Sequence, residues 1–367
     1  MADIGKKSGI VAAAMVPHAP QFLSRPSTED LDQVERVHQC LHSIGDFFRS
    51  KNPDVIVVIT NDHGDEFVTH CVPPFCVHVA DQAEGMHKHR GKWSLHGKLG
   101  YALVPEMMDL GIDLAFTLKA RLQTAFTIPF DFMGFERETP MLAIFVNSYV
   151  PPQPSAERCF AFGKALDRAL ANLGVRAALV ASGGLSHYPG TKLYPNPDVT
   201  TDKGIFERMC EGDLQHLAGL STRHMDKTGN VELRSVQILA GAIGDRIPII
   251  SQFEPSWHHT YASMAWDIEA PNPLVDDYEY NYPPLPGDRV DFAHAIFTLR
   301  SNPKQAAEFI RDPQGWLNDF DLTEEERQAL LNFDAESIRD KFRIHALLTA
   351  GADFQMKIQR EKMSNEG

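Results

Sequence analysis

The chain has 367 residues, of which 43% are hydrophobic and 23% charged, an ordinary composition for a globular protein with a substantial core. Its formal net charge of -14 comes without any run rich in lysine or arginine, so we expect no nucleic-acid partner. The sequence shows neither a secretory signal nor an apolar run approaching the roughly 20 residues that span a bilayer, so we expect a cytoplasmic protein with no membrane association.

The amino-terminal part predicts a strand, a helix and a second strand. An apolar run at residues 9–16 is followed by His18, and apolar positions within residues 31–48 recur at helical spacing. A second apolar run at residues 55–60 is followed by His63. A histidine therefore stands at the carboxyl end of each predicted strand, the edge of an open α/β sheet where ligands usually bind.

The middle of the chain repeats this alternation. Residues 141–146 predict a strand, residues 156–173 a helix and residues 177–181 another strand. A glycine pair ends this last strand, and His187 follows in the predicted turn. A further helix carries Glu232 in its first turn. Strands that alternate with helices predict an α/β domain with a central mixed sheet flanked by helices.

The last quarter of the chain has a different composition. Proline, tyrosine and aspartate dominate residues 276–290, which is typical of a linker. Residues 291–367 have a purely helical pattern, including a capping box formed by Thr323 and Glu326. We therefore predict a main domain at residues 1–275 and a small all-helical appendage after the linker.

Four polar residues at the ends of these elements suit metal chemistry. His18, His63 and Glu232 supply two imidazoles and one carboxylate, and His187 is free to move protons. That set suits a non-haem Fe(II) oxygenase, whose metal keeps open positions for substrate and O2. Each residue also has a plainer interpretation: a core or turn histidine, or for Glu232 a favourable contact with the helix dipole. Spacing alone does not select this set from sixteen histidines.

Other histidines compete for a role. His87 and His89 flank a lysine in a charged stretch, which we interpret as a solvated loop. His258 and His259 are adjacent, and in an extended segment at most one of them would face a given pocket. We rank this pair as substrate contacts before metal ligands. Signatures of phosphate-binding loops, zinc proteases, serine hydrolases and dinucleotide-binding folds are absent from the sequence.

Four short motifs occur in a fixed order along the chain. They are Val16-Pro17-His18-Ala19-Pro20, Asn61-Asp62-His63, Gly183-Gly184-Leu185-Ser186-His187 and Gly229-Asn230-Val231-Glu232-Leu233-Arg234. As an ordered set they resemble the class III extradiol ring-cleaving dioxygenases, which include protocatechuate 4,5-dioxygenase and gallate dioxygenase. The helical tail is similar to the small subunit of protocatechuate 4,5-dioxygenase, which lids the active site, and gallate dioxygenase is similar to a fusion of both subunits.

The resemblance implies that His18, His63 and Glu232 ligate Fe(II) and that His187 is the catalytic acid/base. It implies extradiol cleavage of a single-ring catechol-type aromatic, with both atoms of O2 entering the product. We expect a carboxylated ring such as protocatechuate, gallate or a methylgallate. A 2-aminophenol-cleaving enzyme and a catalytically silent scaffold relative are the alternatives, and we expect a homodimer or a higher homo-oligomer.

Two departures from the family pattern concern the substrate. Many relatives carry Asp-His-Gly in the segment where this chain reads Leu122-Gln123-Thr124-Ala125-Phe126, and Thr124 replaces a histidine that contacts substrate or helps to move protons. The loop after the final strand usually holds small residues. Here it reads Trp257-His258-His259-Thr260-Tyr261 and is bulkier, so we expect a preference for an unusual ring substituent, including an anionic one. The expected substrate contacts are Thr124, His258, His259, Thr260 and Tyr261.

Overall fold

The chain forms two compact units, residues 1–275 and 276–367, in a computed structural model that describes residues 8–274, 282 and 285–365. Each unit has its own hydrophobic core. Most of the predicted linker at residues 276–290 lies outside the described residues, so the linker stays a prediction.

An eight-stranded mixed sheet forms the centre of the larger unit, in the order β6-β3-β7-β2-β8-β1-β10-β9. Strand β8 pairs in parallel with β1 and β2, and β2 pairs in parallel with β7, whereas β10 runs antiparallel to β1 and β9. A separate hairpin joins β4 and β5. The strands are β1 (Gly9–Val16), β2 (Val55–Asn61), β3 (Phe75–His78), β4 (Gln82–Gly85), β5 (Gly91–Ser94), β6 (Ala115–Thr117), β7 (Met141–Val146), β8 (Arg176–Ser182), β9 (Ile250–Pro255) and β10 (Thr260–Asp267).

The central parallel strands are the ones that the sequence predicts, because they are buried on both faces. Every residue of β1, β2, β7 and β8 is buried, so these strands are almost continuous apolar runs. Successive side chains of β1 enter opposite cores: Ala13 and Met15 join one, and Ala12 and Ala14 the other. The predicted α/β fold with a central mixed sheet is confirmed.

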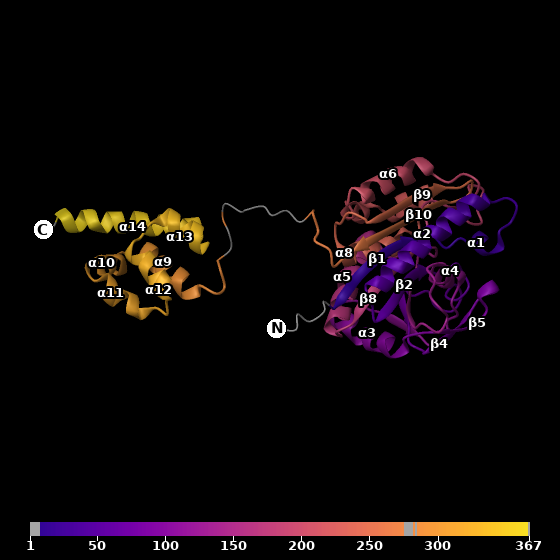
Figure 1. Cartoon of the computed structure of the whole chain (residues 1–367), viewed down its shortest axis with the longest axis horizontal. Coiled ribbons are helices and arrows are strands. Elements are labelled where there is room, and N and C mark those ends of the chain that lie inside the picture. The colour runs from indigo at the N-terminus through magenta and orange to yellow at the C-terminus, as the bar shows by residue number, and fades with distance from the viewer. Residues whose placement is uncertain (1–7, 275–281, 283–284, 366–367) are drawn as a thin grey trace. The chain divides into compact units, whose positions relative to one another are not determined.

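Helices cover both faces of the sheet (Figure 1). Side chains of α3, α5 and α8 enter one core, and those of α2 and α4 enter the other. The predicted start of α2 is confirmed, since the Asp30 carboxylate caps the backbone N–H groups of Asp32 and Gln33. The helices of this unit are α1 (Gln21–Ser24), α2 (Leu31–Ser50), α3 (Gly97–Asp109), α4 (Thr124–Phe132), α5 (Ala156–Asn172), α6 (Val199–Cys210), α7 (Thr222–Thr228) and α8 (Leu233–Ile243).

The smaller unit is all-helical in its described part. Its core gathers large aromatic side chains, among them Phe292, Trp316 and Phe342. The predicted capping box is present, with Thr323 and Glu326 each accepting a hydrogen bond from the other's backbone N–H. The helices are α9 (Val290–Ser301), α10 (Pro303–Arg311), α11 (Pro313–Trp316), α12 (Glu324–Leu331), α13 (Ala335–Phe342) and α14 (Ala346–Asn365).

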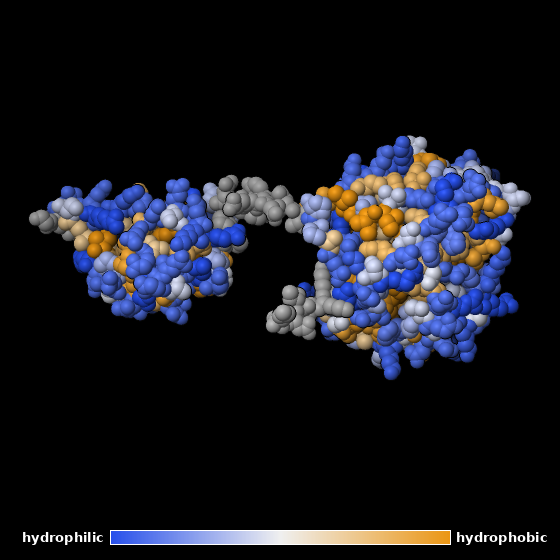
Figure 2. Space-filling model, in the orientation of Figure 1, coloured by the Kyte–Doolittle hydropathy of each residue, from blue (hydrophilic) through white to orange (hydrophobic). Residues whose placement is uncertain are grey.

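Hydrophilic and hydrophobic residues both occur on the surface. The visible faces of both units are mostly hydrophilic, with apolar side chains in small patches (Figure 2). No helix in the described part of the chain combines the length and the apolar character that a bilayer crossing requires.

Two glycines set the spacing between α5 and α8, the helix that begins beside Glu232. A Cβ atom on Gly163 would lie 1.9 Å from the Ile238 backbone oxygen, and one on Gly241 would lie 2.2 Å from the Phe160 backbone oxygen. The two helices can approach this closely only because these positions have no side chain. The position of Glu232 therefore depends on an α5–α8 contact more than sixty residues away along the chain.

We predict that Gly163→Ala lowers the free energy of unfolding of the full chain by about 1–3 kcal/mol, because a methyl group must displace the backbone of α8. Chemical denaturation followed by tryptophan fluorescence measures the change. Gly204→Ala is the matched control: Gly204 lies in α6 with open space around it, so alanine should stabilise by about 0.5–1 kcal/mol. Equal effects at both positions would contradict the close-contact explanation.

Candidate active site

Three of the predicted histidines meet at one edge of the sheet. Strands β2, β8 and β1 are adjacent and parallel, so their carboxyl ends lie side by side. His18 and His63 each follow their strand by two residues, and His187 follows β8 by five. Glu232 is not on a strand but is the N-cap residue of α8. The sequence predicts it one step further on, in the first turn of this helix.

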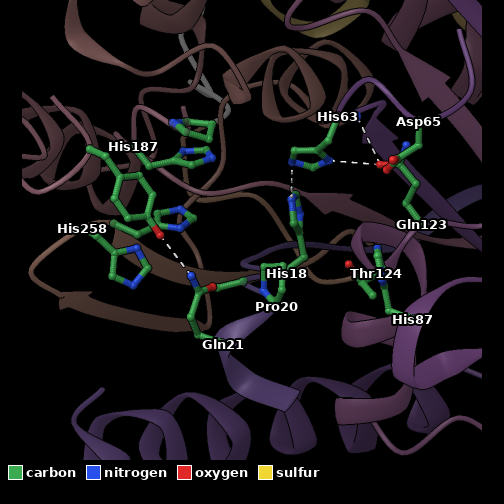
Figure 3. A pocket seen from close by; sticks show the side chains of 14 residues that line it. His18, Pro20, Gln21, His63, Asp65, His87, Gln123, Thr124, His187 and His258 are labelled. Atoms are coloured by element: carbon green, nitrogen blue, oxygen red, sulfur yellow. Dashed lines mark hydrogen bonds between the residues drawn. The ribbon is translucent and has the colours of Figure 1, made fainter. Parts of the chain in front are cut away.

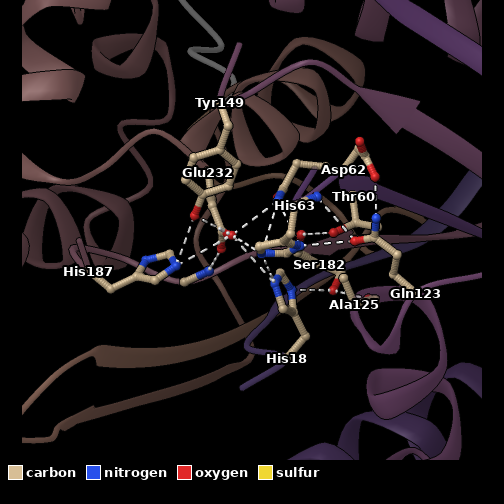
Figure 4. Close-up of polar contacts among 12 residues, drawn as sticks. His18, Thr60, Asp62, His63, Gln123, Ala125, Tyr149, Ser182, His187 and Glu232 are labelled. Carbon is tan, nitrogen blue, oxygen red and sulfur yellow. Dashed lines mark hydrogen bonds and ion pairs between the residues drawn. The ribbon is translucent and has the colours of Figure 1, made fainter. Parts of the chain in front are cut away.

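Two imidazoles and one carboxylate converge there (Figure 4). The Nε2 atom of His63 lies 3.0 Å from Oε1 of Glu232, and Nε2 of His18 lies 3.5 Å from the same oxygen. The two Nε2 atoms are 3.4 Å apart. Potential ligand atoms of all three residues lie within 4.8 Å of one another. The structure therefore brings together the three residues that the sequence predicts as metal ligands.

Hydrogen bonds fix which nitrogen of His18 faces the cluster. Nδ1 of His18 lies 2.9 Å from the Ser182 hydroxyl, which itself donates to the Ala125 carbonyl at 2.6 Å. Because the serine proton is committed to Ala125, the serine oxygen accepts from an Nδ1–H of His18. The Nε2 atom of His18 then presents a lone pair to the cluster.

Gln123 fixes which nitrogen of His63 faces the cluster. Its Oε1 lies 3.1 Å from both Nδ1 and the backbone N–H of His63, and its amide group donates to the Asp62 carboxylate. This bond to Asp62 orients the amide so that its oxygen accepts from Nδ1–H of His63. The family pattern points to the neighbouring Thr124, and no local pattern marks Gln123, although both residues lie in the segment that departs from the family.

The Glu232 carboxylate is the most enclosed group of the cluster. Its Oε2 accepts the backbone N–H of Gly184 at 3.0 Å, and its Oε1 accepts from the Asn61 amide at 3.2 Å and the Tyr149 hydroxyl at 3.0 Å. Burial by itself would raise the pKa of Glu232, but His18 and the other imidazoles hold the pKa well below its ordinary value. The group is therefore a carboxylate at neutral pH.

His187 lies beside the cluster and not within it. Its Nε2 is 3.5 Å from Oε1 of Glu232 and 3.0 Å from the Tyr149 hydroxyl, which donates its own proton to Glu232. The His187 ring stacks on His259, with centroids 4.1 Å apart and an interplanar angle of 9°. Burial lowers the pKa of both rings, and that of His259 falls well below its ordinary value. Sequence reasoning missed Tyr149, because none of the four ordered motifs includes it.

Asp202 ties the loop of His187 to the loop of Glu232. This buried carboxylate accepts the backbone N–H of Ser186 at 3.1 Å, the Ser186 hydroxyl at 2.5 Å and the Asn230 amide at 3.0 Å. Ser186 directly precedes His187, and Asn230 lies two residues before Glu232. One buried side chain therefore holds both loops in place.

The cluster opens into a cavity of about 260 Å³ (Figure 3). Of the predicted substrate contacts, Thr124, His258 and His259 line it, whereas Thr260 and Tyr261 are buried in β10 and are not lining residues. The expectation that at most one of His258 and His259 faces a pocket is wrong. Residues 256–259 form a bend before β10, so adjacent side chains do not alternate as they would in a strand. The lining residues are His18, Ala19, Pro20, Gln21, His63, Asp65, His87, Gln123, Thr124, His187, Pro189, Tyr194, His258 and His259.

The interpretation of His87 and His89 as part of a solvated stretch is wrong for His89, whereas His87 is exposed. Residues 87–89 form a short 3-10 helix. His89 is buried, with Nδ1 2.8 Å from the Thr127 hydroxyl and Nε2 3.3 Å from the Asp131 carboxylate, while His87 lines the cavity. The charged local sequence gives no sign of these contacts, because the partners of His89, Thr127 and Asp131, lie about forty residues further along the chain.

Comparison with known proteins connects this site to one protein family. Residues 12–265 match the family described as the catalytic LigB subunit of aromatic ring-opening dioxygenase. This segment includes the cluster and all the lining residues of the cavity, and it ends before the smaller unit begins.

Several bacterial relatives carry the name 2,3-dihydroxyphenylpropionate/2,3-dihydroxicinnamic acid 1,2-dioxygenase. One from Pseudomonas putida is 32% identical over 166 residues, which are 45% of this chain and 52% of the relative. One from Mycobacterium ulcerans is 27% identical over 257 residues, 69% of this chain and 77% of the relative. The chain spans 52% and 63% of the length of the Pseudomonas putida and Rhodococcus relatives.

We predict that Asp202→Asn lowers the free energy of unfolding by about 1–3 kcal/mol, because an amide leaves one of the buried donors from Ser186 and Asn230 without an acceptor. Chemical denaturation of the full chain measures this. Asp226→Asn, at an exposed position of α7, is the control and should stay within about 0.5 kcal/mol of the wild type. A variant of Asp202 as stable as this control would refute its role as a tie between the loops.

Proposed function

Because the chain belongs to the family of aromatic ring-opening dioxygenases, we propose that it is an Fe(II)-dependent extradiol dioxygenase. In this reaction the ring carbon–carbon bond beside the two hydroxyl groups breaks, and both atoms of O2 enter the product. The observation that carries the proposal is the convergence of His18, His63 and Glu232 at the wall of a cavity, with His187 beside them.

The donor set fits Fe(II). Two neutral imidazoles and one carboxylate are the ligands of the facial triad in non-haem Fe(II) oxygenases. Metal–ligand bonds of about 2.1 Å bring neighbouring donor atoms to about 3 Å from one another, close to the 3.0–3.5 Å found between these three residues. Ser182 and Gln123 hold the Nδ1 atoms of His18 and His63, so that both Nε2 lone pairs are available.

When bound, Fe(II) supplies the Lewis acidity that favours ionised catechol hydroxyls and the redox capacity needed for reaction with O2. The residues of the chain provide the rest. His187 is placed to accept a proton from a substrate hydroxyl and to return one to the opening ring. The stacked ring of His259 restricts the orientation of His187, and the Tyr149 hydroxyl hydrogen-bonds its Nε2 atom.

The cavity suits a single ring with a side chain. Its volume of about 260 Å³ leaves room for one catechol and a short substituent. The relatives are named for substrates with a three-carbon carboxylated chain, and protocatechuate and gallate, which the sequence suggests, are also carboxylated. We therefore propose a carboxylated single-ring catechol, with O2 as the second substrate.

Metal binding and turnover separate the proposed roles. Anaerobically purified protein should bind close to one Fe(II) per chain and consume O2 with a catechol, in an oxygen-electrode assay with ring-opened product followed by absorbance. His18→Ala should lose the iron, because a ligand is removed. His187→Ala should keep the iron while its kcat falls by about 10²–10⁴-fold.

His42→Ala is the control for these variants, since the His42 side chain is 59% exposed on α2. It should leave both iron content and kcat unchanged. Iron loss in His187→Ala would make that residue a ligand, and an iron-loaded protein that consumes no O2 with any catechol or 2-aminophenol would refute the oxygenase proposal.

Tyr149→Phe tests the hydrogen bonds around His187. The ring remains but the hydroxyl that contacts both His187 and Glu232 is lost. We expect kcat to fall about tenfold, the cost of one such hydrogen bond, with KM and iron content unchanged. Steady-state kinetics and metal analysis measure the three quantities. A change in KM alone would place Tyr149 in substrate binding and not in the positioning of His187.

A further inference from the structure

The cavity has two polar ends of different character (Figure 3). Thr124, His87 and Asp65 lie toward one end, and Gln21 and His258 lie toward the other, with His18 between them. None of the described lining residues is a lysine or an arginine. The cavity therefore offers no permanent cation to a substrate, and an anionic or polar substituent has to be recognised by hydrogen-bond donors.

A buried carboxylate stands behind His258. The Nε2 atom of His258 lies 3.2 Å from Oε2 of Glu29, and the two side chains are only 2% and 3% exposed. The indole N–H of Trp257 donates to the other oxygen of Glu29 at 3.3 Å. No other ion-pair partner of Glu29 occurs within the described ranges. A buried carboxylate has to accept hydrogen bonds from the groups that face it. Nε2 of His258 therefore carries a proton and donates a hydrogen bond to Glu29.

This bond determines which atom of His258 is left for a ligand. No described residue hydrogen-bonds Nδ1 of His258, whose ring forms part of the cavity wall. An acceptor oxygen at Nδ1 would place the ring between that oxygen and the Glu29 carboxylate. An imidazole ring that bridges two acceptor oxygens donates one hydrogen bond from each of its two nitrogens. Glu29 therefore prepares His258 to receive a second carboxylate.

Tyr194 supplies a second donor next to it. Its ring stacks on His258 with centroids 5.1 Å apart and an interplanar angle of 24°. The Gln21 amide donates to the Tyr194 hydroxyl oxygen at 3.0 Å. Since this oxygen already accepts a hydrogen bond, the hydroxyl proton of Tyr194 is free to donate to a ligand.

We propose that His258, with Glu29 behind it, and Tyr194 form the subsite for the ring substituent. The subsite takes a substituent that ends in hydrogen-bond acceptor oxygens, a carboxylate or an amide carbonyl. Two adjacent donors match the two oxygens of a carboxylate. At the opposite end of the cavity, a carboxylate would meet the like charge of Asp65. This assignment rests on the proposed function in taking the ring itself to lie at the His18 cluster.

The test uses ligands that lack ring hydroxyls, so binding is measured without turnover. Calorimetry of the anaerobic, iron-loaded full chain compares 3-phenylpropionate, 3-phenylpropionamide and propylbenzene. Tyr194→Phe should weaken both acceptor ligands about tenfold and leave propylbenzene unchanged, since one hydrogen bond is lost. Glu29→Gln should weaken the carboxylate more than the amide, because the charge behind His258 is removed.

Tyr101→Phe is the matched control, because Tyr101 is 64% exposed on α3 and is not a lining residue. It should leave all three affinities unchanged. The subsite is refuted if neither acceptor ligand binds more tightly than propylbenzene, or if Tyr194→Phe weakens all three ligands equally. It is also refuted if Thr124→Val, and not Tyr194→Phe, removes the preference for acceptor oxygens.

Oxygen uptake separates this proposal from the proposed function. With 2,3-dihydroxyphenylpropionate, Tyr194→Phe should raise KM about tenfold at unchanged kcat, and with 3-propylcatechol it should change neither. If no catechol is consumed by the iron-loaded wild type, the proposed function fails while the calorimetry still decides the subsite. If catechols are consumed but the calorimetry shows no preference for acceptor oxygens, the subsite fails alone.

Discussion

The buried carboxylate of Glu232 is the constraint around which the site is organised. Removing a carboxylate from water costs several kcal/mol unless hydrogen bonds and opposite charges compensate. Here a backbone N–H from Gly184, an amide from Asn61 and a hydroxyl from Tyr149 meet its oxygens, and imidazoles surround it. These donors offset the cost of burial, and the Nε2 atoms of His18 and His63 that face the same carboxylate oxygen leave a set of donor atoms that would suit a cation.

Sheet topology explains how these groups reach one point. Adjacent parallel strands deliver His18, His63 and the loop of His187 to the same edge, while α8 brings Glu232 across from the helical layer. The glycine contacts between α5 and α8 fix the depth of that helix, and Asp202 fixes the two loops. The precision of the cluster is therefore a property of the whole larger unit.

The sequence predicts the elements better than the contacts between them. The central strands, helix α2 and the capping box of α12 follow from local patterns, and ordered motifs select His18, His63, His187 and Glu232. Gln123 and Ser182 cannot be predicted in this way. Their partners His63 and His18 lie 60 and 164 residues away in the sequence, and no local pattern encodes such a pairing. The roles of these residues in binding and catalysis, like the lid role of the helical tail, stay predictions.

The two parts of the cavity differ in how they are supported. The cluster is attached to central strands and a packed helix, whereas the wall opposite Thr124 comes from short α1, a turn at Tyr194 and a bend at His258. Loops tolerate substitution more readily than buried strands, so a family can keep one metal chemistry while its substituent wall changes. In this chain the wall is itself braced by a buried acid, Glu29, which repeats on a smaller scale the arrangement around Glu232. That bracing gives a loop-built wall the rigidity that selective recognition requires.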